Sequence, residues 1–310
     1  TMFGGDFYHY ATTTVDLVRK MRRDLHAQGI DYDGFEEVQQ VIDEHLAHDA
    51  GPDEELTSWA AGLDLPFAGE TMMFVDYYNA FQTREFPIAA AKILKAAGVE
   101  FGILKHPHVT TGELYETDED KWVEAAKKNV EALKAAGAKT VILVNPHEYS
   151  YFIKEYPRYC GTLPFEVVYI TDYVNDLIKA GKIAFIKPYN KKVTYHDPCS
   201  LNKLCGNYKA PREIIAALPG AHADVEKPIL QWKYCCGNGV SGAFRKALPD
   251  VAYKIGVRRL RHANDVGAEV LLLACPHCKD MFAETKTKSG INIEPVHILE
   301  VVAYCMGIEV

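Results

Sequence analysis

Two segments of this 310-residue chain repeat one order of features, and this repeat constrains the fold more than any other part of the sequence. Residues 122–152 and 251–282 each carry a helix-like pattern, a Gly-Ala pair, an apolar strand-like run and then a Pro-His pair. Asn145 in the first segment aligns with Cys275 in the second. Any two strand–helix units resemble each other somewhat, but the shared Pro-His pair after matching blocks favours two copies of one unit.

From residue 71 onward, short strand patterns alternate with amphipathic helix patterns. This rhythm is typical of a mostly parallel sheet covered by helices. We therefore predict an α/β fold made of two pseudo-repeated units. Strands are expected over 71–76, 99–104, 139–145, 165–170, 192–196 and 270–275, and helices over 85–98, 120–137, 171–181, 210–220 and 251–266. Thr171 or Asp172 is the expected cap of the helix over 171–181.

The chain before residue 71 has a different character. Residues 10–48 predict helices, and Gly29 is well placed to end the first of them. Residues 50–70 predict a loop with one short helix. We therefore expect three parts: a helical segment over 1–70, a first α/β unit over 71–190, and a second over 191–310.

The composition of the chain argues against some classes of binding partner and location. A formal net charge of −8 and a pI near 5.8 argue against nucleic acid. No apolar run approaches the roughly 20 residues that cross a bilayer, and the sequence shows no secretory signal. A cytoplasmic location is expected, with any membrane association made through partner subunits. The chain starts without Met, which is compatible with a preceding module.

The eight cysteines are unevenly distributed, and none occurs before Cys160. In a chain without a secretory signal, such clustering favours metal binding or redox chemistry over structural disulfides. The adjacent pair, Cys235 and Cys236, is too close along the backbone for a relaxed disulfide with each other. Five cysteines of the second unit form three groups: Cys199, then Cys235 with Cys236, then Cys275 with Cys278.

Each group follows a predicted strand or lies at a glycine-rich turn. The carboxyl ends of parallel strands share one edge of a sheet, so distant groups can converge there. Several thiolates at one point repel one another unless a cation neutralises them, which favours a metal centre.

Zinc takes four ligands and leaves a fifth cysteine surplus, whereas iron–sulfur clusters accept thiolates at irregular spacing. Adjacent cysteines point in different directions and could bind different irons. Gly237 and Gly239 would let the backbone fold tightly around an iron–sulfur cluster. A zinc-binding assembly module without turnover remains the alternative from another class.

Three stretches, "HDPCSL", "YCCGNG" and "LLLACPHCKDMF", resemble the cysteine-rich CCG domain of heterodisulfide reductase catalytic subunits and their relatives. Those relatives include iron–sulfur subunits of glycolate and lactate oxidases. They also include the catalytic subunit of the membrane complex of dissimilatory sulfur metabolism, whose pattern is most similar because only one CCG domain is intact here. The resemblance implies one non-cubane [4Fe–4S] cluster. The implied ligands are Cys199, Cys235, Cys236, Cys275 and Cys278, with Gly237 in the cofactor-binding turn.

The first unit departs from the family pattern. Its cysteine positions hold Tyr78 or Asn79, the His106–His108 region, Asn145 and Glu148, so a second such cluster is not expected there. Family members of this kind carry an N-terminal ferredoxin module. The resemblance therefore implies further iron–sulfur centres on a missing module or on a partner.

The resemblance also implies a function. We expect an oxidoreductase subunit acting on a sulfur group, which reduces or forms a disulfide or trisulfide. The substrate would be a small thiol compound or a carrier protein, and electrons would be exchanged with partner iron–sulfur, flavin or membrane redox subunits. The alternative is an electron-relay subunit of a glycolate- or lactate-type oxidase.

Two histidines flank the expected ligands. His196 and His277 could each donate a proton during S–S cleavage, and a packing role is an equal alternative. The other three cysteines, Cys160, Cys205 and Cys305, are expected to be ordinary side chains, although Cys205 could be a sixth ligand.

Further polar residues have two interpretations each. His106, His108, His147 and Glu148 could form a zinc or proton-relay site, but a scaffold that has lost its metal is favoured. Arg258, Arg259 and Arg261 could receive an anionic partner tail, but a solvated helix face is favoured.

Overall fold

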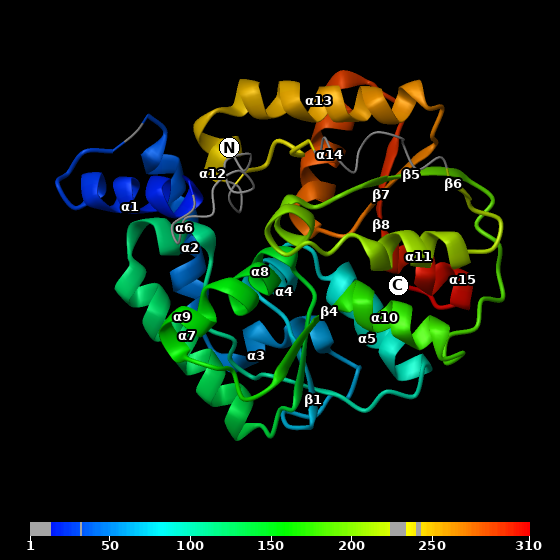
Figure 1. Ribbon diagram of the computed structural model, residues 1–310, viewed down its shortest axis with the longest axis horizontal. Coiled ribbons are helices and arrows are strands. Elements are labelled where there is room, and N and C mark those ends of the chain that lie inside the picture. The colour runs from blue at the N-terminus through cyan, green and yellow to red at the C-terminus, as the bar shows by residue number, and fades with distance from the viewer. Residues whose placement is uncertain (1–13, 32, 224–233, 240–242) are drawn as a thin grey trace.

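The computed structural model describes residues 14–31, 33–223, 234–239 and 243–310. Two four-stranded sheets, each wholly parallel, are surrounded by helices (Figure 1). The first sheet has the order β2-β1-β3-β4 and the second the order β6-β5-β7-β8, so one arrangement occurs twice. The predicted α/β class is confirmed.

The strands are short. They are β1 (Thr71–Phe74), β2 (Gly102–Ile103), β3 (Thr140–Leu143), β4 (Glu166–Tyr169), β5 (Lys192–His196), β6 (His222–Ala223), β7 (Val270–Leu273) and β8 (Glu294–His297). The predicted strand over 99–104 is reduced to its two residues in β2. The final strand, β8, lies where the sequence predicted no element.

The α-helices alternate with these strands. They are α1 (Thr14–His26), α2 (Phe35–Asp49), α3 (Asp53–Leu56), α4 (Tyr77–Phe81), α5 (Glu85–Ala96), α6 (Gly112–Thr117), α7 (Glu119–Ala135), α8 (Pro146–Lys154), α9 (Tyr156–Cys160), α10 (Ile170–Lys179), α11 (Lys209–Ala217), α12 (Ala243–Ala247), α13 (Pro249–Asp265), α14 (Pro276–Ser289) and α15 (Ile298–Met306). The described residues also include a 3₁₀ turn, η2 (Ser58–Ala60), and a π-helix, η3 (Ser200–Leu204).

Local chemistry explains several boundaries and corrects one. Asp118 caps α7 by accepting from the backbone N–H of Lys121, and Gly290 ends α14 in the left-handed conformation. The cap predicted at Thr171 or Asp172 is wrong, because α10 starts directly after β4 with Tyr169 as its N-cap. Both residues lie in the first turn, where the Thr171 side chain is buried.

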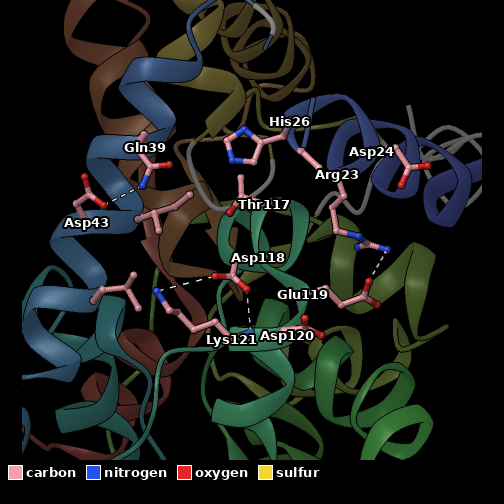
Figure 2. Close-up of a pocket in the computed structure, with 13 residues that line it drawn as sticks. Arg23, Asp24, His26, Gln39, Asp43, Thr117, Asp118, Glu119, Asp120 and Lys121 are labelled. Carbon is pink, nitrogen blue, oxygen red and sulfur yellow. Dashed lines mark hydrogen bonds and ion pairs between the residues drawn. The ribbon is translucent and has the colours of Figure 1, made fainter. Parts of the chain in front are cut away.

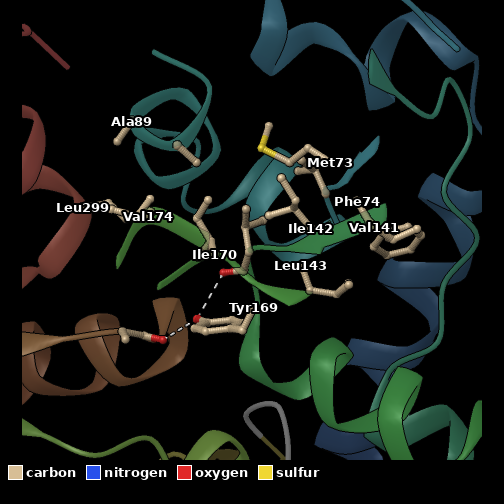
Figure 3. Close-up of a cluster of buried hydrophobic side chains, with 14 of the residues drawn as sticks. Met73, Phe74, Ala89, Val141, Ile142, Leu143, Tyr169, Ile170, Val174 and Leu299 are labelled. Carbon is tan, nitrogen blue, oxygen red and sulfur yellow. Dashed lines mark hydrogen bonds between the residues drawn. The ribbon is translucent and has the colours of Figure 1, made fainter. Parts of the chain in front are cut away.

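One hydrophobic core joins the two sheets. It includes Met73 and Ile142 from the first sheet, Val193 and Leu272 from the second, and Leu299 from α15. Figure 3 shows Leu299 beside Ala89 and Val174 of the first sheet's helices. Helix α5 packs on α15, and α10 packs on α11. In each pair one helix comes from the first unit and one from the second, so these helices form the contact between the two units. The predicted boundaries between the three parts of the chain, at residues 70/71 and 190/191, remain a prediction.

A tyrosine of the first sheet supports the backbone next to two cysteines of the second. The Tyr169 hydroxyl, at the end of β4, donates a hydrogen bond of 2.5 Å to the carbonyl oxygen of Ala274 (Figure 3). Ala274 directly precedes Cys275, and both it and Tyr169 are fully buried. This bond therefore fixes the chain where β7 leads into α14.

Replacing this hydroxyl should destabilise the fold. Tyr169→Phe keeps the ring but removes the hydroxyl that donates to the buried carbonyl of Ala274, and losing a partner of a buried polar group costs about 1–3 kcal/mol. We expect that decrease in the free energy of unfolding, measured by denaturant titration. Tyr304→Phe is the control, because Tyr304 is 47% exposed, and its effect should stay within about 0.5 kcal/mol. Equal effects of the two variants would contradict the role of the Tyr169 bond.

Candidate metal centre

Two neighbouring strands bring two cysteine groups together. Strands β5 and β7 pair in parallel, with His196 opposite Leu273 at their carboxyl ends. Cys199 follows β5 after an Asp-Pro step, and Cys275 follows β7 as the N-cap of α14. Cys278 lies in the first turn of α14. The register of one strand pair therefore places three thiols at a single sheet edge.

The third cysteine group lies in a tight glycine turn. Gly237 has φ of 104°, and a Cβ atom there would lie 2.3 Å from the carbonyl oxygen of Ala252 in α13. Only glycine fits this position. The N–H of Gly237 donates to Cys235 Sγ at 3.3 Å, and the N–H of Asn238 donates to Cys236 Sγ at 3.4 Å. The turn thus directs backbone donors at both sulfurs.

All five predicted thiols meet. The thiols interact in series: Cys199 with Cys235, Cys235 with Cys236, Cys236 with Cys278, and Cys278 with Cys275. Three of the five, Cys236, Cys275 and Cys278, are buried, whereas Cys199 and Cys235 are partly exposed. The ligand atoms of Cys236, Cys278 and His196 all lie within 4.8 Å of one another.

Electrostatics limit the charge that these thiols can carry alone. Hydrogen bonds from Cys199 and Cys236 lower the pKa of Cys235 far below its usual value. The pKa values of Cys199 and Cys236 are raised, mainly because each interacts with the Cys235 thiolate and because the protein around the two sulfurs disfavours further charge. Ionising several of these thiols together therefore needs a positive charge beside them.

The residues present fit an iron–sulfur group. Soft, mutually adjacent thiolates are the ligands that such clusters use. The backbone N–H groups of Gly237 and Asn238 add the donors that tune cluster sulfurs. The five cysteines predicted from the sequence would hold the group, and this ligand set stays a prediction.

Both flanking histidines are buried and neutral near pH 7. Burial, reinforced by Arg259, lowers the pKa of His196 to about 3. Burial lowers the pKa of His277 well below its usual value. Among the described residues, His196 Nε2 and His277 Nδ1 have no hydrogen-bond partner. Their proton-donor role remains a prediction, and it would use a neutral imidazole N–H.

The first unit also contributes side chains next to this centre. The ring centroid of Tyr78 lies 3.7 Å from that of His277, and the ring centroid of His147 lies 4.7 Å from it. Asn145 donates to His277 Nε2 at 3.4 Å and to Asp76 at 2.7 Å. The positions that replace cysteine in the first unit therefore include two that face the second unit's centre.

Sequence reasoning missed two carboxylates in this network. Asp76 accepts hydrogen bonds from Asn79 and Asn145, and Asp280 accepts one from the Tyr78 hydroxyl. Asp76 follows β1, as Asp197 follows β5, so its place after a strand was an available signal. Asp280 carried none, because its partner is 202 residues away.

The four residues predicted as one zinc or relay set do not form a single site. Glu148 accepts a hydrogen bond from Thr110 at 2.8 Å, and burial with nearby Asp76 raises its pKa well above the usual value. His147 lies against His277 instead. His106 and His108 lie together beside Asp49. The sequence could not show that these four residues belong to different places, because their partners (Thr110, His277 and Asp49) are distant along the chain.

The remaining cysteines and arginines were predicted to be ordinary side chains and a solvated helix face. Burial raises the pKa of Cys205 and of Cys305 to about 11, and Cys160 ends α9. The solvated-face interpretation is wrong for Arg259, which is buried and donates to the carbonyl of Tyr195 at 3.0 Å. Arg258 is exposed and stacks on Tyr234, and Arg261 is exposed.

A polar groove of about 510 Å³ lies between α1, α2 and the start of α7 (Figure 2). Its charged side chains pair with one another: Arg23 with Glu119 at 3.0 Å, and Lys121 with Asp118 at 3.9 Å. The groove is also lined by His26 and by further carboxylates. The chemistry is concentrated at the thiols.

Comparison with known proteins agrees with this geometry. The cysteine-rich CCG domain family matches residues 193–283. A dihydromethanophenazine:CoB–CoM heterodisulfide reductase subunit from Methanosarcina acetivorans is 34% identical over 230 residues, covering 72% of this chain and 55% of that protein. The EtfAB:quinone oxidoreductase of Syntrophomonas wolfei is 30% identical over 71% of this chain and 31% of that protein. A hypothetical protein from Helicobacter pylori shares the fold, with a TM-score of 0.56 and 13% identity over 82% of this chain and 54% of that one.

Residues 193–283 therefore belong to the cysteine-rich CCG-domain family. Within it, the sequence is similar to the heterodisulfide reductase of Methanosarcina acetivorans. It spans about half the length of the curated relatives that it matches. In the part of the chain that the structure describes, every helix is too short or too polar to cross a membrane.

Removing one buried thiol should release iron. Cys236→Ser replaces a soft ligand at the middle of the thiol contacts, so we expect it to lose most of the iron and the visible absorption of the anaerobically purified protein. Cys305→Ser is a matched control, because Cys305 is equally buried but lies in α15. Iron content by mass spectrometry is the measurement. Equal iron in the two variants would refute the ligand set.

Proposed function

We propose that this chain is part of a redox enzyme that reduces or forms an S–S bond at one non-cubane [4Fe–4S] cluster. Cys199, Cys235, Cys236, Cys275 and Cys278 would bind the cluster. The observation that carries the proposal is the contact of all five thiols. A single tetrahedral ion needs only four ligands, so the fifth thiol favours an extended cluster over zinc.

When bound, the cluster would supply single electrons and a soft Lewis acid for a substrate sulfur. In the reducing direction, a disulfide takes up two electrons and two protons and gives two thiols. Partner iron–sulfur, flavin or membrane redox subunits, or a further module, would supply the electrons. The chain's own residues would bind the substrate and direct protons.

Exposure indicates the side from which a substrate approaches. Cys236, Cys275 and Cys278 are closed off by the core, whereas Cys199 and Cys235 are partly exposed. A disulfide or trisulfide would therefore reach the centre along the Cys199–Cys235 edge. A ring nitrogen of His196 lies within 4.8 Å of the sulfurs of Cys236 and Cys278, and His277 lies between Cys275 and Cys278 in the sequence, so an N–H of either imidazole could donate to a departing thiolate.

An electron-relay role is the second candidate. The name of the Syntrophomonas wolfei relative describes quinone reduction rather than disulfide chemistry. In this alternative the same five cysteines bind the cluster, but no substrate sulfur reaches it. The substrate response of the cluster therefore separates the two candidates.

Electron paramagnetic resonance tests the proposal directly. The oxidised protein is mixed with coenzyme M, coenzyme B or 2-mercaptoethanol, with and without ³³S in the thiol. We expect a new paramagnetic signal with at least one thiol, and ³³S should broaden it, because the sulfur binds next to the unpaired spin. Cys305→Ser should give the same signal as the unsubstituted chain. A spectrum indifferent to every thiol would contradict sulfur chemistry and support the relay.

A further inference from the structure

A second group of metal-ligand side chains lies in the first unit. His106 and His108 follow β2, and Asp49 is the last residue of α2. The ligand atoms of these three residues all lie within 4.8 Å of one another. The carboxylate and the two imidazoles come from two separate parts of the chain. Each side chain is about one quarter exposed, so an ion can reach it from solvent.

The distances match the edges of a metal coordination shell. Asp49 Oδ1 lies 3.3 Å from His108 Nδ1 and 3.6 Å from His106 Nε2. Two ligand atoms on one tetrahedral zinc lie about 3.3–3.5 Å apart when each bond is about 2.0–2.1 Å long. One carboxylate oxygen thus faces two imidazole nitrogens at the separation that a shared ion requires.

A second carboxylate orients one of the imidazoles. His106 Nδ1 lies 3.0 Å from Asp53 Oδ1, opposite the ring nitrogen that faces Asp49. A carboxylate behind the distal ring nitrogen is the usual support of a metal-bound histidine, because it fixes the tautomer and ring orientation. Asp53 is therefore a positioning residue in this arrangement.

The backbone of the second histidine is also fixed. Asn129 of α7 accepts from the N–H of His108 at 2.7 Å and donates to its carbonyl at 2.9 Å. The N–H of Val109 donates to Asp49 Oδ1 at 3.2 Å. These bonds hold the ligand atoms in place before any ion binds.

The charges around this group suit a cation. Asp49 ends α2, where the helix dipole is negative. Burial opposes ionisation of Asp49, but hydrogen bonding to His108 holds its pKa below the usual value. On the facing helix α7, Glu124 and Lys128 pair at 2.8 Å and add no net charge.

We propose that Asp49, His106 and His108 bind a divalent transition-metal ion, with Zn²⁺ as the ion to test. Two imidazoles, one carboxylate and an open fourth position form a recognised zinc donor set. The ion would fasten the end of α2 to the loop after β2. It would thus join the N-terminal helices to the first sheet. This site is independent of the five thiols and of the proposed redox function.

Zinc binding to the full, anaerobically purified chain tests the proposal. We expect one zinc per chain after equilibrium dialysis against micromolar Zn²⁺, in addition to iron. Zinc X-ray absorption should show nitrogen and oxygen neighbours with an imidazole signature. The double variant His106→Gln, His108→Gln should lose this zinc, and Asp53→Asn should weaken its affinity about 10–100-fold.

His26→Gln is the matched control. His26 also pairs with an aspartate, Asp31, at 2.7 Å, but the described residues offer that pair no third ligand. Its zinc affinity should stay within about twofold of the unsubstituted chain. Absence of retained zinc, zinc bound by sulfur, or equal affinity in the double variant and in His26→Gln would overturn the site. Because iron content is measured on the same samples, failure here is separable from failure of the redox proposal.

Discussion

Mutual repulsion among buried thiolates is the constraint on which the centre of this molecule depends. Interactions with neighbouring thiols and burial raise the pKa values of Cys199, Cys236 and Cys278, so these thiols resist ionising together. Further ionisation needs positive charge, which iron supplies. The surrounding protein is built to keep the thiols together: β5 and β7 set the spacing of three, and the Gly237 turn packs against Ala252 to bring in two.

The first unit is more than a copy without cysteines. It supplies the Tyr169 hydroxyl that supports the backbone beside Cys275, and the Tyr78, Asn145 and His147 side chains that surround His277. The shared core keeps these contacts fixed relative to the second sheet. The first unit therefore lines part of the second unit's thiol centre, although the side chains that it places there are not cysteines.

Local patterns predicted much of this, and long-range contacts account for what they missed. Strand and helix periodicity gave the α/β class, and the rule that parallel strands share a carboxyl edge predicted that Cys199 would meet Cys275. The same reasoning could not pair Tyr78 with Asp280, since side-chain partners across 202 residues leave no spacing signal. Likewise Arg259 looks like part of a solvated basic face, and only packing against β5 shows it buried. No sequence pattern indicates that Asp49 lies near His106, because the two residues are separated by a predicted loop and several further elements.

Anomalous diffraction at the iron absorption edge is the most direct test of the central claim. Crystals of the anaerobically purified chain would be measured above and below that edge. The account predicts one compact group of iron peaks within bonding distance of the sulfur atoms of Cys199, Cys235, Cys236, Cys275 and Cys278. Iron bound elsewhere, or a single metal ion held by only four of these thiols, would contradict it.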